Sequence, residues 1–180
     1  MMVYPLAEMS RTAVAEADND FQILSKYTFR MDDLLRKMNY AGQSEVCVVN
    51  SPTSFDARLA SWRLEAEVHE SLGPNATFVV AFATTKGAVD AIAEQAHACT
   101  QGDATVWVAY PKTSSKRYRC DFNRDTGWDQ FGAHGFEPVR QVAIDEDWSA
   151  LRFRRVEYIK KMTRSFAMTE EGRAKSQSPD

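Results

Sequence analysis

Residues 139–155, VRQVAIDEDWSALRFRR, decide the predicted fold. They hold two runs of strand character, Val139–Asp145 and Trp148–Arg155, which only Glu146 and Asp147 separate. Parallel strands need a crossover connection of a dozen or more residues, so a link this short requires the two strands to be antiparallel. We therefore expect the sheet of this protein to close with a C-terminal antiparallel hairpin.

Upstream of the hairpin, short apolar runs alternate with helical patterns. Buried strands are predicted over residues 45–50, 77–82 and 105–109, with a weaker candidate over 64–69, and helices over 31–38, 54–62 and 86–100. Continuously apolar strands separated by helices are typical of a parallel sheet covered on both faces. Right-handed crossovers then predict a three-layer, Rossmann-like α/β fold with a mostly parallel sheet of five or six strands.

The remaining segments are polar. A loop is predicted over 112–120, then a helix over 123–134 that Asp121 or Asn123 would cap, and a last helix with a basic face over 156–164. Residues 1–30 are expected to form a partly disordered arm and residues 165–180 a disordered polar tail. The sequence thus predicts a single Rossmann-like domain over residues 31–164.

Composition and charge narrow the classes of function. The chain has 180 residues, 44% hydrophobic and 26% charged, which is typical of one globular domain. Residues 1–100 carry 8 basic and 13 acidic side chains, whereas residues 101–164 carry 12 and 9. An excess this small argues against nucleic-acid binding. It does predict that any site for an anion lies in the second half of the chain.

The cysteines and the apolar runs predict the cellular compartment of the protein. Cys47, Cys99 and Cys120 form no CxxC pair, and an odd number argues against a disulfide framework. The apolar runs have strand length, far short of a membrane span. The first twenty residues lack a basic segment followed by an apolar core. We expect a cytoplasmic protein with no membrane partner.

Several long runs resemble a known family. WVAYPKTSSKRY (107–118), DFNRDTGW (121–128), GFEPVRQVAIDEDWSALRFRR (135–155) and YIKKMTR (158–164), together with LLRKMNYAGQ (34–43), resemble an uncharacterised bacterial domain family of unknown function. The resemblance covers roughly residues 34–164 and implies a methyltransferase-like Rossmann fold without an established cofactor. A parallel sheet closed by a hairpin is also the layout of class I methyltransferases. The resemblance implies no catalytic residues.

The turn after the first strand argues against S-adenosylmethionine chemistry. Methyltransferases place glycines there so that the backbone comes close to the cofactor. Here residues 50–55 read NSPTSF, with no glycine and with a proline that removes a donor. P-loop and GxSxG motifs are missing from the sequence, and the three histidines form no metal-ligand pattern. The sequence therefore predicts no cofactor, no metal site and no catalytic residue.

The composition of the loop predicted over 112–120 exceeds what folding requires. It directly follows a predicted buried strand, so it lies at the carboxyl edge of the sheet, where open α/β sheets bind ligands. Basic and hydroxyl side chains gather there and at the start of the next predicted helix, whose N–H groups favour anions. The predicted anion-binding residues are Lys112, Ser114, Ser115, Lys116, Arg117, Asn123 and Arg124. The alternative is a solvated loop whose cations pair with Asp121 and Asp125.

The leading functional prediction is a non-catalytic binding module for a small ligand that bears a phosphate or a carboxylate. The first alternative is an interaction or homo-oligomerisation domain that uses the hairpin and the basic C-terminal helix. The second is a divergent transferase without the usual S-adenosylmethionine motif.

Overall fold

The computed structural model describes residues 31–162 and 167–177. From Asp32 onward, the described residues belong to one compact unit. The arm predicted over residues 1–30 lies outside the described residues. In the described part of the chain, every helix is too short or too polar to cross a bilayer.

The described elements alternate between strands and helices. In chain order they are α2 (Asp33–Lys37), β1 (Glu45–Val49), the 3-10 turn η1 (Thr53–Phe55), α3 (Asp56–Trp62), β2 (Glu67–His69), β3 (Phe78–Phe82), α4 (Lys86–Cys99), β4 (Thr105–Pro111), α5 (Asp129–Ala133), β5 (Phe136–Ala143), β6 (Trp148–Arg155), the 3-10 turn η2 (Val156–Tyr158) and α6 (Glu170–Gln177).

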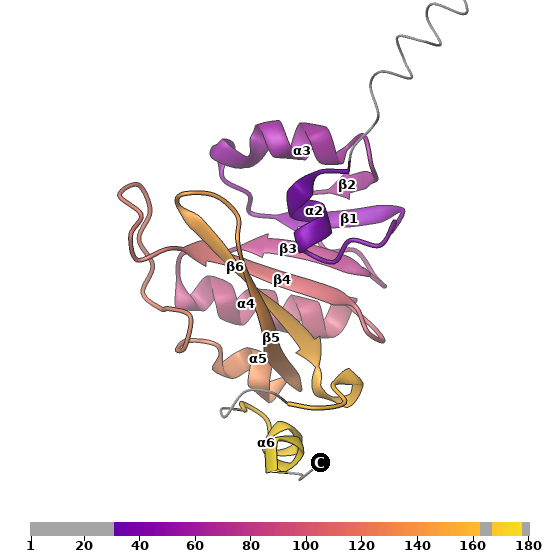
Figure 1. Ribbon diagram of the computed structural model, residues 1–180, viewed down its shortest axis with the longest axis vertical. Helices are drawn as coiled ribbons and strands as arrows, with labels where there is room; N and C mark the ends of the chain where they lie inside the picture. Colours follow the sequence, from indigo (N-terminus) through magenta and orange to yellow (C-terminus); the bar gives the residue numbers. More distant parts are fainter. Residues whose placement is uncertain (1–30, 163–166, 178–180) are drawn as a thin grey trace, which may run out of the picture. The chain divides into compact units, whose positions relative to one another are not determined.

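The six strands form one sheet in the order β2-β1-β3-β4-β6-β5 (Figure 1). β1 pairs in parallel with β2 and β3, and β3 pairs in parallel with β4. β6 runs antiparallel both to β4 and to β5, so β5 points in the same direction as β4. This arrangement confirms the mostly parallel, methyltransferase-like Rossmann fold and its antiparallel C-terminal pair.

Two apolar layers cover the two faces of the sheet. On one face, Val79, Val108 and Phe153 pack under α4 and α5 in the main hydrophobic cluster. On the other face, Trp107 donates its indole N–H to the Met38 carbonyl at the end of α2, at 2.8 Å. The ring of Phe55 in η1 lies edge-on to Phe82 of β3 on that second face. β1, β3 and β4 are buried on both sides, which is why their sequences are almost continuously apolar.

The helix predicted over 123–134 is mostly a turn. Asn123 and Thr126 form an isolated antiparallel bridge, and α5 begins only at Asp129. Gly127 has a φ of +95°, a left-handed conformation that interrupts a helix. The predicted caps are therefore wrong, because Trp128 precedes α5 and makes no side-chain cap. Asp121 instead accepts the Lys86 backbone N–H at the start of α4, at 2.7 Å.

Two predictions near the C-terminus also need correction. In place of the helix predicted over 156–164, residues 156–158 make a single 3-10 turn, and Ile159 is extended. Ile159 is instead buried in a small cluster with Met162 and Ala167. The tail predicted as disordered contains helix α6, at whose start the buried carboxylate of Glu137 accepts two backbone N–H groups.

Candidate ligand-binding cleft

A cleft of about 460 Å³ opens at the carboxyl edge of the sheet, beside the ends of β4 and β5 and the start of β6. This volume lies within the usual range for small-molecule sites. Its lining combines aromatic, amide, hydroxyl and charged groups: Tyr110, Pro111, Lys112, Thr113, Phe122, Asn123, Arg124, Asp125, Gln141 and Ser149.

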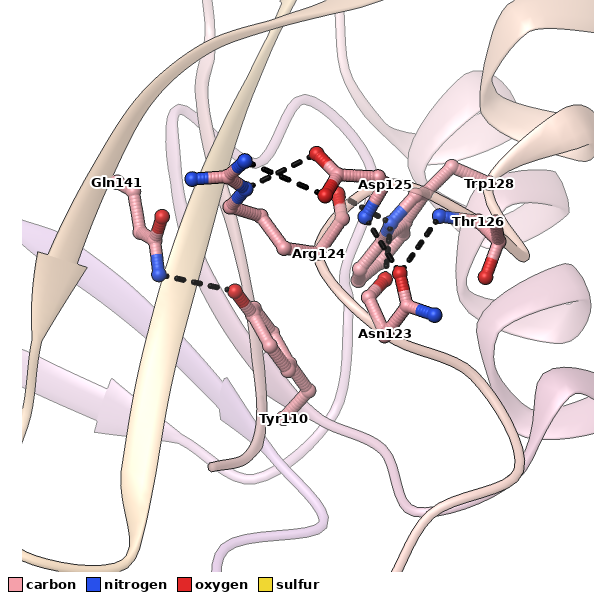
Figure 2. Close-up of polar contacts among 7 residues, drawn as sticks. All are labelled: Tyr110, Asn123, Arg124, Asp125, Thr126, Trp128 and Gln141. Carbon is pink, nitrogen blue, oxygen red and sulfur yellow. Dashed lines mark hydrogen bonds and ion pairs between the residues drawn. The ribbon is translucent and has the colours of Figure 1, made fainter. Parts of the chain in front are cut away.

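Tyr110 forms one wall of the cleft and is held on two sides. Its ring packs against those of Phe122 and Trp128, with centroid separations of 6.1 and 5.7 Å. Its hydroxyl accepts a hydrogen bond from the Gln141 amide, at 3.0 Å (Figure 2). Because the packing fixes the ring, the phenol oxygen and the exposed Gln141 side chain occupy defined positions at the cleft.

A tight turn over residues 123–127 forms the opposite wall. The Asn123 side-chain oxygen accepts the backbone N–H groups of Asp125 and Thr126, at 2.8 and 3.1 Å (Figure 2). Trp128 donates its indole N–H to the Asn123 carbonyl at 2.9 Å. At Gly127, an added Cβ would lie only 2.6 Å from the Phe122 Cβ. The turn thus depends on the Asn123 amide and on the missing side chain at Gly127.

The charges at the cleft are two cations and one carboxylate. Arg124 makes a two-pronged ion pair with Asp125, with nitrogen–oxygen distances of 2.9 and 3.2 Å (Figure 2). This hydrogen bonding raises the pKa of the Arg124 guanidinium above its usual value. Lys112 lines the cleft and donates to the Asp145 carbonyl at 2.5 Å. The cleft therefore carries an excess of one positive charge.

The structure separates the predicted anion-binding residues into two groups. Lys112, Asn123 and Arg124 line the cleft together. Ser115 is buried, and its hydroxyl donates to the Asp147 carboxylate at 2.8 Å. Ser114, Lys116 and Arg117 are exposed side chains of the same loop, outside the residues that line the cleft. The Arg124–Asp125 pair is one of the ion pairs expected for a solvated loop, so both interpretations of the loop retain an observation in their favour.

Sequence reasoning did not select Tyr110, Gln141 or Ser149. Tyr110 ends an apolar strand and reads as a core residue. Gln141 and Ser149 belong to the hairpin, which the sequence analysis treated as architecture. Gln141 gave a signal, because an exposed polar side chain beside the buried Val142 marks an open patch of the sheet. Ser149 gave none, since it is buried between Trp148 and Ala150.

The turn after β1 is the segment that the sequence analysis compared with the glycine turn of methyltransferases. Asn50 has a φ of +56° there, a left-handed conformation that asparagine tolerates better than most residues. Pro52 follows, and η1 begins at Thr53. The backbone of this turn is thus strongly bent without glycine. In the described ranges, 31–162 and 167–177, three or more His, Cys, Asp or Glu side chains nowhere gather as a metal site.

No family model matches the sequence, and the curated proteins contain no match to it. Solved structures with a similar fold include a SAM-dependent methyltransferase from Aquifex aeolicus, with 10% identity over 68% of this chain and 87% of that one and a TM-score of 0.49. A putative type 11 methyltransferase from Sulfolobus solfataricus has 7% identity over 68% and 89% of the two chains, with a TM-score of 0.42. The Methanococcus jannaschii fibrillarin pre-rRNA processing protein has 9% identity over 63% and 67%, with a TM-score of 0.42. The similarity is one of fold alone.

Proposed function

We propose that this protein is a binding module for a small organic anion, held in the cleft between the turn at 123–127 and strands β4, β5 and β6. The observation that carries the proposal is the convergence of Lys112, Arg124 and the Tyr110–Gln141 pair on one cleft at the carboxyl edge of the sheet. Open α/β sheets present their ligand sites at this edge.

The charges define the anionic end of the ligand. Arg124 presents a planar guanidinium that suits a carboxylate or a phosphate, whereas Lys112 supplies a point charge. Asp125 already occupies Arg124, so the ligand would compete with this carboxylate or share the guanidinium with it. A ligand with a single anionic group matches the excess of one positive charge.

The other lining residues define the rest of the ligand. The rings of Tyr110 and Phe122 offer apolar surface, and the Gln141 amide oxygen and the Ser149 hydroxyl offer hydrogen bonds. Inorganic phosphate would leave the apolar wall unused. We therefore expect a phosphate monoester or a carboxylic acid with an organic body.

A ligand screen tests this proposal. Thermal unfolding of the full chain is measured with a panel of phosphate monoesters, mononucleotides and monocarboxylic acids. A ligand that binds only the folded state raises the melting temperature. Arg124→Ala should weaken the binding of a positive compound about tenfold or more, since hydrogen bonds to charged groups contribute ~1.5–3 kcal/mol. Gln141→Ala should weaken it less, since a neutral hydrogen bond contributes ~0.5–1.5 kcal/mol.

Lys116→Ala is the matched control, because it removes an exposed charge from the same loop outside the cleft residues. It should leave the affinity within about twofold of the parent. The proposal fails if no compound shifts the parent protein. It also fails if Lys116→Ala reduces binding as much as Arg124→Ala does.

A divergent transferase remains a second candidate because of one observation, the left-handed Asn50 at the end of β1. The bent backbone imitates the shape of a glycine turn, although the side chain remains. Calorimetric titration with S-adenosylmethionine separates the two functions. Binding that Asn50→Val abolishes and Arg124→Ala preserves would favour the transferase.

A further inference from the structure

Three arginines lie on the face of the sheet opposite the cleft residues Tyr110 and Gln141. Arg152 and Arg154 alternate along β6, and Arg140 of β5 is the register partner of Arg152. On β4, Trp107 is the other register partner of Arg152 and packs toward α2. Side chains at paired positions share a face of the sheet, and so do side chains two residues apart on one strand. These three arginines therefore lie on one face, and we call Arg140, Arg152 and Arg154 the arginine patch.

The arginine patch carries more positive charge than its neighbours neutralise. Arg154 makes a close two-pronged ion pair with Asp103. Among the described residues, Arg140 donates to the neutral side-chain oxygen of Asn39, at 3.0 Å. Arg152 is half-buried, and its Nε is buried without a hydrogen-bond partner among the described residues. Among the described residues, one carboxylate, that of Asp103, makes an ion pair with the three arginines.

Glu137, the register partner of Arg154, makes no ion pair with the arginine patch among the described residues. Its carboxylate is fully buried and accepts the Met168 and Thr169 backbone N–H groups and the Thr169 hydroxyl, at 3.0, 2.6 and 2.7 Å. These donors use the oxygens that could otherwise pair with an arginine. Arg140 and Arg152 therefore have no paired carboxylate among the described residues.

This arrangement costs stability. Like charges directly opposite each other on neighbouring strands are destabilising, and Arg140 stands opposite Arg152. Burial lowers the pKa of the Arg152 guanidinium, and the nearby charges of Arg154 and Arg140 lower it further. A desolvated cation beside like charges is a poor choice for folding alone, whereas a bound anion would add attractive interactions that offset the repulsion and the desolvation.

We propose that the arginine patch is a second anion site, separate from the cleft, and that it binds the phosphate group of a small ligand through Arg140 and Arg152. Guanidinium groups recognise phosphate oxygens in a bidentate geometry that lysine does not reproduce. Two such groups on neighbouring strands match an anion with several oxygens. Arg154, which Asp103 already engages, adds long-range attraction.

The test uses the full chain with inorganic pyrophosphate as the probe. Pyrophosphate should raise the melting temperature of the parent protein by several degrees at concentrations well above the dissociation constant. Arg152→Met should weaken this binding about tenfold or more, and Arg140→Met should do the same. Arg152→Lys, which keeps the charge and loses the planar fork, should give an intermediate loss.

A second readout separates a binding site from a merely structural arginine. Without anion, Arg152→Met should melt at a higher temperature than the parent, because it removes a desolvated and repelled charge. Arg154→Met should melt lower, since it breaks the pair with Asp103. Because Arg140 is exposed, its variant still tests the site if Arg152→Met does not fold.

The source of the phosphate and the independence of the cleft are tested in the same experiment. Inorganic phosphate, pyrophosphate and mononucleotides are compared as separate arms, and Arg124→Ala should keep the full pyrophosphate shift. The proposal is overturned if pyrophosphate leaves the parent unchanged, or if it shifts both methionine variants as much as the parent. Binding of a short oligonucleotide without any pyrophosphate shift would overturn it as well.

Discussion

The loop over residues 112–128 and the C-terminal segment over 167–177 are both polar, yet different contacts hold them. The loop is organised mainly by its own side chains, since Ser115 and Asn123 each accept two backbone N–H groups of the following residues. The C-terminal segment is held from outside, by the carboxylate of Glu137 on β5. A polar segment therefore has a defined structure whenever its backbone donors find acceptors, whether these are local or distant.

The largest loss of stability is expected from removing Glu137, the distant anchor of the C-terminal segment. Glu137→Ala should lower the free energy of unfolding by about 3 kcal/mol, because it leaves the buried donors of Thr169 and the half-buried N–H of Met168 without an acceptor. Urea unfolding measures this loss, and hydrogen exchange should show faster exchange confined first to 167–177. The exposed Glu170→Gln is the matched control. Equal losses in the two variants would show that Glu137 does not anchor the segment.

The turn at 123–127 should be the next most sensitive point. Gly127→Ala should destabilise the protein by about 1–3 kcal/mol, because the new Cβ would meet Phe122 at 2.6 Å in a left-handed conformation. The melting temperature and the affinity of the cleft for a ligand should both fall. In contrast, Gly87→Ala places its Cβ in open space within α4 and should be neutral or stabilising. A neutral Gly127→Ala would contradict the proposed close packing of this turn.

Removing Ser115, a local anchor of the loop, should cause a smaller loss of unfolding free energy. Ser115→Ala removes a buried hydroxyl that donates to Asp147 and accepts the N–H groups of Arg117 and Tyr118. The expected cost is about 1–2 kcal/mol in chemical unfolding. Ser114→Ala, at the exposed neighbouring position, should change little. If Ser115→Ala has no effect, the loop does not depend on its own side chains in the way described above.

The smallest loss of stability is expected for a surface ion pair that lies outside both segments. Arg154 hydrogen-bonds to Asp103 and lowers the pKa of that carboxyl below its usual 3.8. Because the folded-state pKa is the lower one, the stabilisation is present above about pH 3.8 and is lost as the pH falls through the folded-state value. Asp103→Asn should cost under about 1 kcal/mol at pH 7, since both side chains are partly exposed.

The pH dependence of the stability difference between the parent and Asp103→Asn tests this prediction. Unfolding of the parent and of Asp103→Asn is compared from pH 7 down to acid, and the gap should close once Asp103 is protonated. A gap that persists unchanged at low pH would show that the ion pair is not its cause.

Periodicity predicted the sheet well because it reports burial directly. Valine-rich runs such as residues 45–50 and 77–82 lie in strands buried on both faces, and the short link at Glu146 and Asp147 allows only one pairing. The predicted helix over 123–134 was wrong because Asn123 competes for backbone donors and Gly127 breaks the helical conformation. The tail prediction missed α6 because the acceptor for its first turn lies on β5, 32 residues away.

For the candidate site, the sequence by itself determined the edge of the sheet and three of the lining residues, Lys112, Asn123 and Arg124. Those residues follow one buried strand, and the direction of a strand sets which edge its loop occupies. Only the tertiary structure decided that Gln141 and Ser149 join them and that Ser115 turns inward. It also placed Arg140 opposite Arg152. Strand register makes these pairings, and register depends on contacts between distant residues that local patterns do not encode.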